Sequence, residues 1–161
     1  MAAPACPCPA LLCGPLPEIR TTLASHWARL SSRSRRLRFL GTPDESFFPR
    51  FAARLEPLFV IGVRIDGKVR GVCEAHVLPN DHAEIAISIE DAWQGQGYGR
   101  QLFEAGLEKA AEAGVKTVDL FFSQENQSIA HLAYSLGAEI RTSYGECEAY
   151  IRLEGRPAER S

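Results

Sequence analysis

A glycine-rich segment at residues 94–99, with the sequence QGQGYG, joins a predicted strand directly to a predicted helix. Before it, at residues 83–90, apolar residues alternate with polar or small ones, which is the period of a strand with one polar face. After it, from about residue 97 to residue 113, an apolar stripe at helical spacing ends before Gly114. The segment must therefore form a strand–turn–helix unit in which backbone amides and a helix N-terminus face one space.

Antiparallel strands are predicted upstream of this unit. Residues 58–63 form a nearly continuous apolar run, the Asp-Gly pair at 66–67 is a two-residue hairpin signal, and residues 69–78 return as a second strand. The Pro-Asn-Asp segment at 79–81 then turns the chain into the strand at 83–90. These segments predict a run of antiparallel strands.

Downstream, strand and helix patterns alternate. We expect a strand at 117–122, a helix at 126–136, and strands near Ala138 and Cys147. With the upstream strands, this order predicts an α/β fold built on a mixed, mostly antiparallel sheet that has helices on both faces.

Two further helices are predicted nearer the N-terminus. The first covers about residues 18–34, and a shorter one follows Asp44 with phenylalanines on one side. Arginines cluster at the end of the first helix: Arg29, Arg33, Arg35, Arg36 and Arg38. We expect them to form a solvated face that complements the helix dipole, with a site for an acidic partner or a nucleotide as the alternative.

Length and composition indicate one folded domain. The chain has 161 residues, of which 45% are hydrophobic and 24% charged. We expect a proline-rich flexible leader at 1–17, a domain at 18–154 and a flexible tail at 155–161. The leader lacks the basic start of a secretory signal, and no apolar run approaches the roughly 18 residues of a membrane span, so we expect a cytoplasmic protein.

Charge and cysteine content argue against two classes of function. The formal net charge is −2 with a pI near 6.1, which gives no support for a nucleic-acid partner. Cys6, Cys8 and Cys13 have no nearby histidine and no second Cys-x-x-Cys, so we expect them to be incidental residues of the leader and not a metal site. The odd total of five cysteines fits a reducing compartment.

The glycine-rich segment is best explained as a phosphate site. A P-loop would need Gly-x-x-x-x-Gly-Lys-Ser/Thr, which is absent, and the dinucleotide fingerprint fails because Arg100 occupies the place of its third glycine. The pattern that does fit is Gln-x-x-Gly-x-Gly, at Gln94, Gly97 and Gly99. This pattern resembles the pyrophosphate-binding signature of GNAT acetyltransferases.

The resemblance covers roughly residues 37–153. It includes the strands before the signature, the helix after it, and the segments at 125–128 and 134–138. The segments at 37–40, 83–86 and 91–95 are similar to the acetyltransferase domain of bacterial protein lysine acetyltransferases. The chain departs from those proteins because no acyl-CoA-synthetase-like or nucleotide-sensing domain accompanies it, and because the family's first strand is hard to find in the leader.

The resemblance implies a GNAT fold with strands splayed at the acyl-CoA site, acetyl-CoA as co-substrate and no metal. It implies the following cofactor-binding residues: Ile87, Ser88, Ile89, Gln94, Gly95, Gln96, Gly97, Tyr98, Gly99, Arg100 and Asn126. In similar proteins the pantetheine amides pair with the edge of the strand near Ile87 and Ile89, as in strand addition. Asn126 is also an excellent helix N-cap, and both roles can hold together.

Acetyl transfer to an amine needs a base. Glu84 is the candidate, because it lies on the polar face of its strand and is followed there by small residues that leave room for an acceptor. The matching glutamate is the base in similar enzymes, whereas an arbitrary glutamate would pair with a cation on the surface. Glu90 is the second candidate base, for which a turn or capping role is favoured. His76 and His131 match no family position.

Tyr134 is the candidate acid that protonates the departing thiolate. On its predicted helix it forms an i, i+4, i+8 ridge with Asn126 and Ala130, apart from the buried stripe. A half-buried aromatic with a hydrated hydroxyl is the alternative.

The predicted function is thus an N-acetyltransferase acting on a primary amine, with a protein lysine as one acceptor. The alternatives are a small-molecule amine acetyltransferase and a non-catalytic acyl-CoA sensor or partner module. The final strands often pair between subunits in similar proteins, so a homodimer is also considered.

Overall fold

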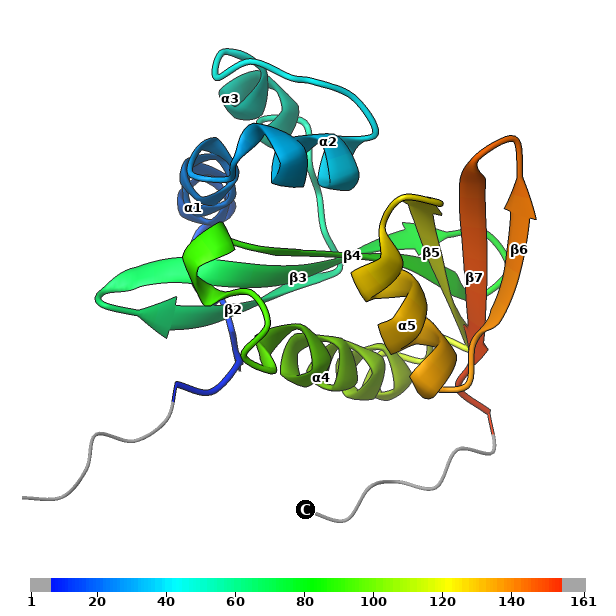
Figure 1. The fold of residues 1–161 in the computed structure, drawn as a ribbon. Helices are drawn as coiled ribbons and strands as arrows, with labels where there is room; N and C mark the ends of the chain where they lie inside the picture. Colours follow the sequence, from blue (N-terminus) through cyan, green and yellow to red (C-terminus); the bar gives the residue numbers. More distant parts are fainter. Residues whose placement is uncertain (1–6, 155–161) are drawn as a thin grey trace, which may run out of the picture.

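The computed structural model describes residues 7–154. A seven-stranded sheet runs in the order β1-β2-β3-β4-β5-β7-β6 and carries helices on both faces, as predicted (Figure 1). The strands are β1 (Ala10–Leu11), β2 (Phe59–Ile65), β3 (Lys68–Leu78), β4 (His82–Ile89), β5 (Thr117–Ser123), β6 (Glu139–Ser143) and β7 (Glu146–Arg152). The helices are α1 (Leu16–Ala28), α2 (Ser32–Phe39), α3 (Phe47–Ala52), the 3₁₀ turn η1 (Asp91–Trp93), α4 (Tyr98–Glu112) and α5 (Gln127–Ser135).

Tight turns set the register of the antiparallel strands. Asp66 and Gly67 join β2 to β3 with φ values of 53° and 77°, the positive values that a two-residue type I′ hairpin requires. Asn80 and Asp81, which precede β4, also have positive φ values, of 64° and 61°. The hairpins predicted from the turn residues are confirmed.

The sheet splits between β4 and β5. These strands are parallel and pair only through residues 82–84 of β4 and 117–119 of β5. Beyond that point they separate, and the edge of β4 from Ile85 to Ile89 that faces β5 has no partner strand among the described residues. The split therefore leaves exposed backbone amides and carbonyls beside the glycine-rich segment.

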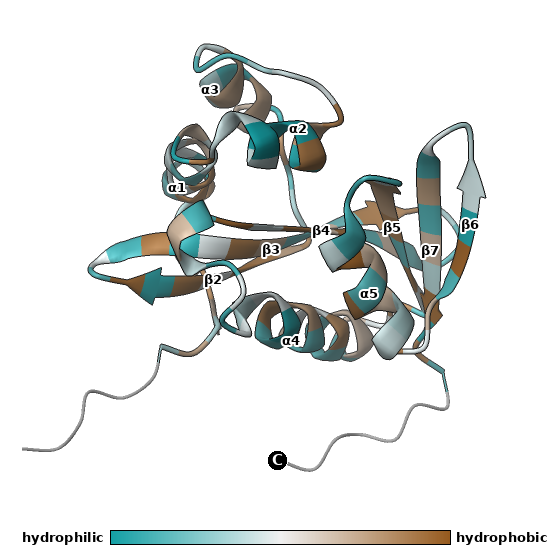
Figure 2. Cartoon of the chain, viewed as in Figure 1, coloured by the Kyte–Doolittle hydropathy of each residue, from teal (hydrophilic) through white to brown (hydrophobic). Residues whose placement is uncertain are grey.

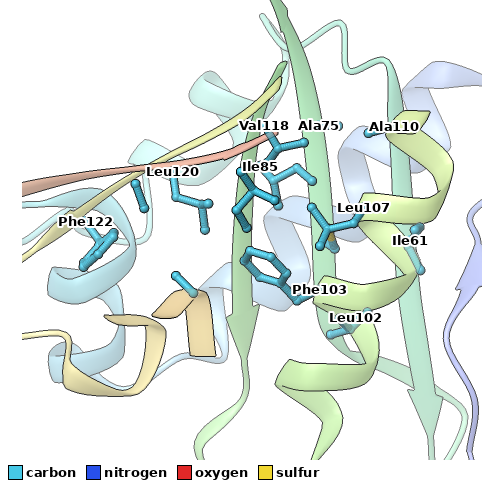
Figure 3. Packing of buried hydrophobic residues seen from close by; sticks show 14 of the residues in the cluster. Ile61, Ala75, Ile85, Leu102, Phe103, Leu107, Ala110, Val118, Leu120 and Phe122 are labelled. Atoms are coloured by element: carbon cyan, nitrogen blue, oxygen red, sulfur yellow. The ribbon is translucent and has the colours of Figure 1, made fainter. Parts of the chain in front are cut away.

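Two cores lie on opposite faces of the sheet. On one face α4 and α5 cover the larger core, in which Phe103 and Leu107 of α4 pack against Ile85 of β4 and Leu120 of β5 (Figure 3). On the other face α1 and α3 cover a second core centred on Trp27. Successive residues of β4 point to opposite faces of the sheet, and both faces are covered by helices. The polar face predicted for this strand is therefore partly buried.

The helix predicted at 18–34 is confirmed as far as Ala28, where α1 ends, but its last residues belong to a second helix, α2. The Ser31 hydroxyl accepts a hydrogen bond from the Ser34 amide and caps a new helix, and Asp91 accepts further bonds from the Ser31 amide and hydroxyl. Hydrophilic residues dominate α2, with hydrophobic ones toward its C-terminal end (Figure 2). Leu40 follows it in the left-handed region, with φ 54°.

The N-terminal segment contributes more than was predicted. Residues 1–6 of the predicted leader and 155–161 of the predicted tail lie outside the described residues. Within the remainder of the leader, Ala10 and Leu11 form β1 and pair with Gly62 and Ile61 of β2, and α1 begins at Leu16. Within residues 7–154, no helix has the length and apolar character needed to span a bilayer.

Candidate active site

A cavity of about 500 Å³ opens where β4 and β5 separate. Its floor is the β4 segment from Glu84 to Ile89, and Gln94, Gly95 and Gly99 line one end. Side chains from α2, α3, β5 and α5 form the walls, including Arg33, Leu37, Phe47, Phe121, Asn126 and Ile129. The sheet split and the glycine-rich segment thus belong to one concave site.

The glycine-rich segment forms an open cradle. Gly95 and Gly97 have φ values of 74° and 90°, and a Cβ added at either would meet nothing within 4 Å. Gly97 is the N-cap of α4, so the first backbone N–H groups of that helix point out of its end without intrahelical partners. Open space, positive φ and free amides at a helix N-terminus fit the phosphates of a nucleotide cofactor.

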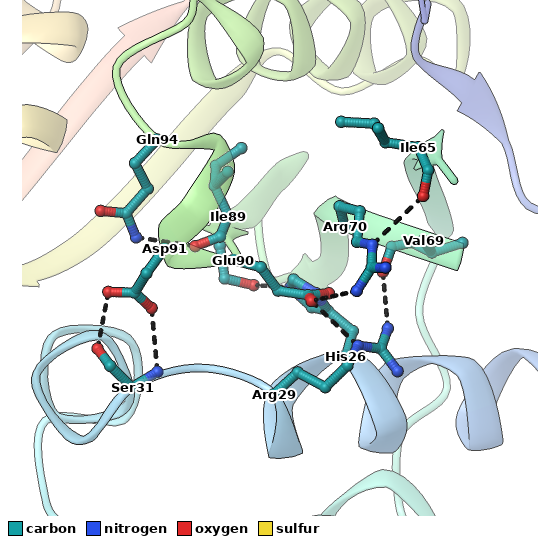
Figure 4. Close-up of polar contacts among 11 residues, drawn as sticks. His26, Arg29, Ser31, Ile65, Val69, Arg70, Ile89, Glu90, Asp91 and Gln94 are labelled. Carbon is teal, nitrogen blue, oxygen red and sulfur yellow. Dashed lines mark hydrogen bonds and ion pairs between the residues drawn. The ribbon is translucent and has the colours of Figure 1, made fainter. Parts of the chain in front are cut away.

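Gln94 fastens the cradle to its surroundings (Figure 4). Its side-chain Nε2 donates to the Ile89 carbonyl at 2.8 Å and to the Ser34 hydroxyl at 3.1 Å. Asp91 accepts hydrogen bonds from Ser31 and Ser34; burial raises the pKa of Asp91, but these bonds outweigh it and hold the pKa below its usual value. The start of the cradle is therefore fixed to both β4 and α2.

Glu84 lies on β4 at the edge of the cavity. Its side chain is half-buried, and it faces His76 of β3 and Asp119 of β5 in the register of the sheet. Both of these residues are hydrogen-bonded elsewhere: His76 Nε2 lies 3.1 Å from Glu74 Oε1, and Asp119 Oδ1 lies 2.7 Å from His82 Nδ1. No hydrogen bond or ion pair is recorded for the Glu84 carboxylate within residues 7–154, so it is available to a molecule in the cavity.

Ser88, His26 and Glu90 form a buried chain of hydrogen bonds (Figure 4). His26 is fully buried; its Nδ1 lies 3.0 Å from Glu90 Oε2 and its Nε2 lies 2.9 Å from Ser88 Oγ. Burial lowers the pKa of His26 more strongly than the Glu90 carboxylate raises it. A neutral His26 then donates from Nδ1 to the carboxylate and accepts from the Ser88 hydroxyl.

Glu90 is the N-cap residue of the turn η1, as predicted, and its side chain is in addition the centre of an ion-pair network. Arg29 and Arg70 each donate to Glu90 Oε1 at 3.0 Å. Burial acts to raise the pKa of Glu90, but the hydrogen bonds from His26, Arg29 and Arg70 bring it down to about 2. A carboxylate held in this way is a poor base, so the Glu90 alternative is not supported.

The prediction of a solvated arginine face holds for Arg33 and Arg36 and is wrong for the others. Arg29 pairs with the buried Glu90, and Arg38 donates to the buried Glu74 at 2.7 Å. Arg38 also stacks over Phe39, while Arg35 stacks over Phe48. These contacts fix α1 and α2 over the sheet.

The structure brings most of the predicted site residues to the cavity. Glu84, Ile87, Ser88, Ile89, Gln94, Gly95, Gly99 and Asn126 line it. Asn126 also caps α5, because its Oδ1 accepts from the Ile129 amide at 3.3 Å. Gln96, Gly97, Tyr98 and Arg100 belong to the cradle segment without lining the cavity, and Arg100 donates to Ser135 and Glu104.

Tyr134 is not brought to Glu84. Its side chain is 75% exposed and is absent from the cavity wall, whereas Ile129 and Leu132 of the same helix line it. The ridge predicted to face the cofactor therefore contributes Asn126 alone, because the helix turns Tyr134 toward solvent.

The individual residues of the wall contributed by α2 and α3 were not predicted as site residues from the sequence. This wall consists of Leu37, Phe39, Leu40, Phe47 and Phe51, together with Arg33, Ser34 and Arg38. The phenylalanines had been noted only as one side of a short helix. These phenylalanines are more than 40 positions before the glycine-rich segment, and nothing in the sequence indicates that both line one cavity.

The cysteines of the N-terminal segment were expected to be incidental residues. Cys6 lies outside residues 7–154, and Cys8 and Cys13 are exposed. No group of three or more His, Cys, Asp or Glu in the described part of the chain is arranged to hold a metal ion.

Solved structures share the fold at low sequence identity. The GNAT domain of S. lividans PAT is 18% identical with a TM-score of 0.73, and the match covers 89% of each chain. The structure of yncA from Salmonella typhimurium with its cofactor acetyl-CoA is 15% identical with a TM-score of 0.69, over 98% of this chain and 99% of that one. The ribosomal-protein-S18-alanine N-acetyltransferase from Escherichia coli is 20% identical with a TM-score of 0.67, over 97% and 99%.

The sequence itself also matches a family. No curated protein matches the chain. Residues 25–138, more than half of the chain, match the model of the Acetyltransferase (GNAT) family. The match spans α2, the β4 strand, the glycine-rich cradle and α5. The chain therefore belongs to the Acetyltransferase (GNAT) family and is an acetyl-CoA-dependent N-acetyltransferase.

Proposed function

We propose that the chain acetylates a primary amine by direct attack of the amine on the thioester of acetyl-CoA, with Glu84 as the general base. One observation carries this proposal: Glu84 and the glycine-rich cradle line the same cavity, at the two ends of the unpaired β4 edge. A cofactor whose phosphates occupy the cradle would extend its arm along this edge toward Glu84.

The residues of β4 and α5 suit the pantetheine arm. The edge of β4 at Ile87 and Ile89 has no partner strand among the described residues, so its amides and carbonyls can pair with the amides of the arm. Ile129 and Leu132 provide an apolar surface on the opposite side of the cavity. Asn126 lines the same cavity, and we assign it a contact with the arm in addition to its capping role.

The attacking nitrogen must be neutral. A free lysine amine has a pKa near 10.4, so its deprotonation at pH 7 costs about 4.6 kcal/mol. We assign Glu84 the removal of this proton, directly or through one water, as the C–N bond forms and the C–S bond breaks. The departing CoA sulfur gains a proton and leaves as the thiol.

The source of that second proton is not assigned to a side chain. Tyr134 was the candidate from sequence, but its exposed position outside the cavity wall gives no support for that role. The cavity is open, so water can supply the proton. Activity in this proposal therefore depends on Glu84 and on cofactor placement.

A protein lysine is the acceptor that we propose, with a small-molecule amine as the alternative. The wall from α2 and α3 contributes the apolar side chains of Leu37, Leu40, Phe47 and Phe51, which suit the aliphatic part of a lysine side chain. The S. lividans neighbour is the GNAT domain of a PAT protein and the E. coli neighbour acetylates an alanine of a ribosomal protein, which also favours an acceptor carried on a protein.

The test is a reaction of the purified protein with acetyl-CoA and a set of lysine peptides and small primary amines. Thiol release gives the rate, and mass spectrometry identifies the acetylated atom. We expect Glu84→Gln to lower kcat by about 10²-fold or more with unchanged CoA affinity. Glu108→Gln is the matched control, because Glu108 is exposed on α4 and does not line the cavity.

Two results would contradict the proposal in different ways. Unchanged kcat in the Glu84→Gln variant would remove the general base. Tight binding of CoA without acetylation of any amine would instead indicate a binding module.

A further inference from the structure

Arg33 lies beside the cradle end of the cavity. One face of α2 contributes Arg33, Ser34, Leu37 and Arg38 to the cavity wall, and Leu30 of the connection between α1 and α2 continues this face at spacings of three and four. Ser34 donates to Asp91 and accepts from Gln94, so the first turn of α2 is fixed against the start of the cradle. Arg33 is thereby held at the phosphate end, while Leu37 and Arg38 face the Glu84 end.

Arg33 differs from the other arginines of α2 in having an unengaged charge. Arg35 is 3.8 Å from Glu45, Arg36 is 3.1 Å from Glu125, and Arg38 is 2.7 Å from Glu74. No ion pair or hydrogen bond is recorded for the Arg33 guanidinium within the described residues, and its side chain is exposed. It can therefore turn toward a ligand without breaking an existing contact.

The cradle lacks a cation of its own. Gln94, Gly95 and Gly99 line the cavity there with neutral groups, and the guanidinium of Arg100 is directed at Ser135 and Glu104. Asp91 lines the same end, and its lowered pKa keeps it negative. Helix amides alone would have to hold a dianion next to this carboxylate, so a nearby cation has a clear electrostatic role.

We propose that Arg33 binds the diphosphate of acetyl-CoA from the α2 side, opposite the amides of the cradle. This inference rests on the proposed binding of acetyl-CoA in the cavity. The diphosphate is then held between α2 and the N-terminus of α4, two elements on opposite faces of the sheet. The planar guanidinium matches two phosphate oxygens at once, which a lysine ammonium does not.

The experiment compares the affinities of two ligands by calorimetry: CoA, and dephospho-CoA, which keeps the diphosphate and lacks the 3′-phosphate. We expect Arg33→Ala to weaken both by about tenfold, with a smaller loss in Arg33→Lys. In steady-state kinetics the KM for acetyl-CoA rises in Arg33→Ala while kcat is retained. Arg36→Ala is the matched control and should bind both ligands normally, because Arg36 pairs with Glu125 and does not line the cavity.

Each contrary outcome is distinct. Equal CoA affinity in the wild type and Arg33→Ala overturns the inference. A loss of affinity for CoA without a loss of affinity for dephospho-CoA also overturns it, because that result locates Arg33 at the 3′-phosphate. A fall in the unfolding midpoint of Arg33→Ala would also overturn it by showing a structural role. Absence of CoA binding by the wild-type protein would defeat the proposed function itself.

Discussion

Tyr134 and Glu84 show how the surroundings of single residues decide their chemistry. Glu84 is half-buried on the cavity floor, whereas Tyr134 projects from α5 with 75% of its side chain exposed. The structure gives no geometric support for proton donation from Tyr134 to a thiolate in the cavity. We therefore expect Tyr134→Phe to change the initial rate of acetylation by less than about twofold, well below the 10²-fold scale of a lost acid.

One result of the Tyr134→Phe assay would contradict this expectation. A fall of tenfold or more would restore Tyr134 as the acid and would require α5 to rotate when the cofactor binds. Tyr144→Phe provides the control, because Tyr144 is fully exposed in the β6–β7 turn.

The open glycine-rich segment could be predicted from residue types in the sequence, whereas the buried ion pairs around the site could not. The glycine spacing at 94–99 required no long-range information, because positive φ and absent Cβ atoms act locally. The ion pairs of the Glu90 side chain were not predicted, because its partner His26 lies 64 positions earlier in the chain. Arg38 was misjudged for the same reason, since Glu74 is 36 positions later.

Among the elements, α4 packs on the sheet through a glycine. Gly106 is buried, and a Cβ added there would lie 2.7 Å from Cys73 Sγ on β3 and 3.3 Å from Ile85 Cδ1 on β4. Alanine is the better helix former by about 1 kcal/mol, but overpacking a core costs about 1–3 kcal/mol. We expect Gly106→Ala to lower the free energy of unfolding in denaturant titrations by about 1 kcal/mol.

The control for Gly106→Ala is the same change at Gly99. Gly99 is in the same helix, and its added Cβ would be 4.0 Å from the nearest atom, Leu132 Cδ2. Its substitution should leave stability unchanged or raise it. Combining Gly106→Ala with Cys73→Ala should recover part of the loss, and strict additivity of the two changes would contradict the steric explanation.

Element order was predictable where period and turn residues agreed. The strands of the central sheet and α4 followed from alternation, the Asp66-Gly67 turn and the apolar stripe. The break between α1 and α2 did not, because the hydrogen bonds that hold the capping residue Ser31 go to Asp91, 60 positions away in sequence. The strand β1 was missed because its two residues gain their pairing from β2, about 50 positions away in sequence.

At the scale of the whole molecule, buried polar contacts join the α1–α2 layer to the strand that carries the site. His26 and Arg29 of the α1 region hold Ser88 and Glu90 at the end of β4, and Gln94 and Asp91 tie the cradle to α2 (Figure 4). The cavity is formed between these layers, so its shape depends on them. Conditions that charge His26 should therefore act on the whole fold.

The direction of this pH effect follows from the two pKa shifts. The pKa of His26 is lowered from 6.5 in the folded protein. Below about pH 6.5 the unfolded chain therefore binds a proton at His26 more tightly than the folded protein does. Glu90 has its pKa lowered from 4.5 to about 2, so its stabilising contribution is complete above pH 4.5 and is lost only below that value. Between pH 6.5 and 5 the loss of stability on acidification is thus assigned to His26.

We expect the free energy of unfolding of the wild-type protein to fall as the pH is lowered from 7.5 to 5, with a slope for this proton that approaches about 1.4 kcal/mol per pH unit. In His26→Gln, which keeps a hydrogen-bonding side chain without a titrating ring, denaturant titrations should show a shallower slope in the same range. NMR titration of the folded wild-type protein provides an independent measurement, in which the His26 ring should titrate below its usual pKa of 6.5. A His26 ring that titrates near 6.5 in the folded state would contradict the argument, because folding would then have no proton linkage to this residue.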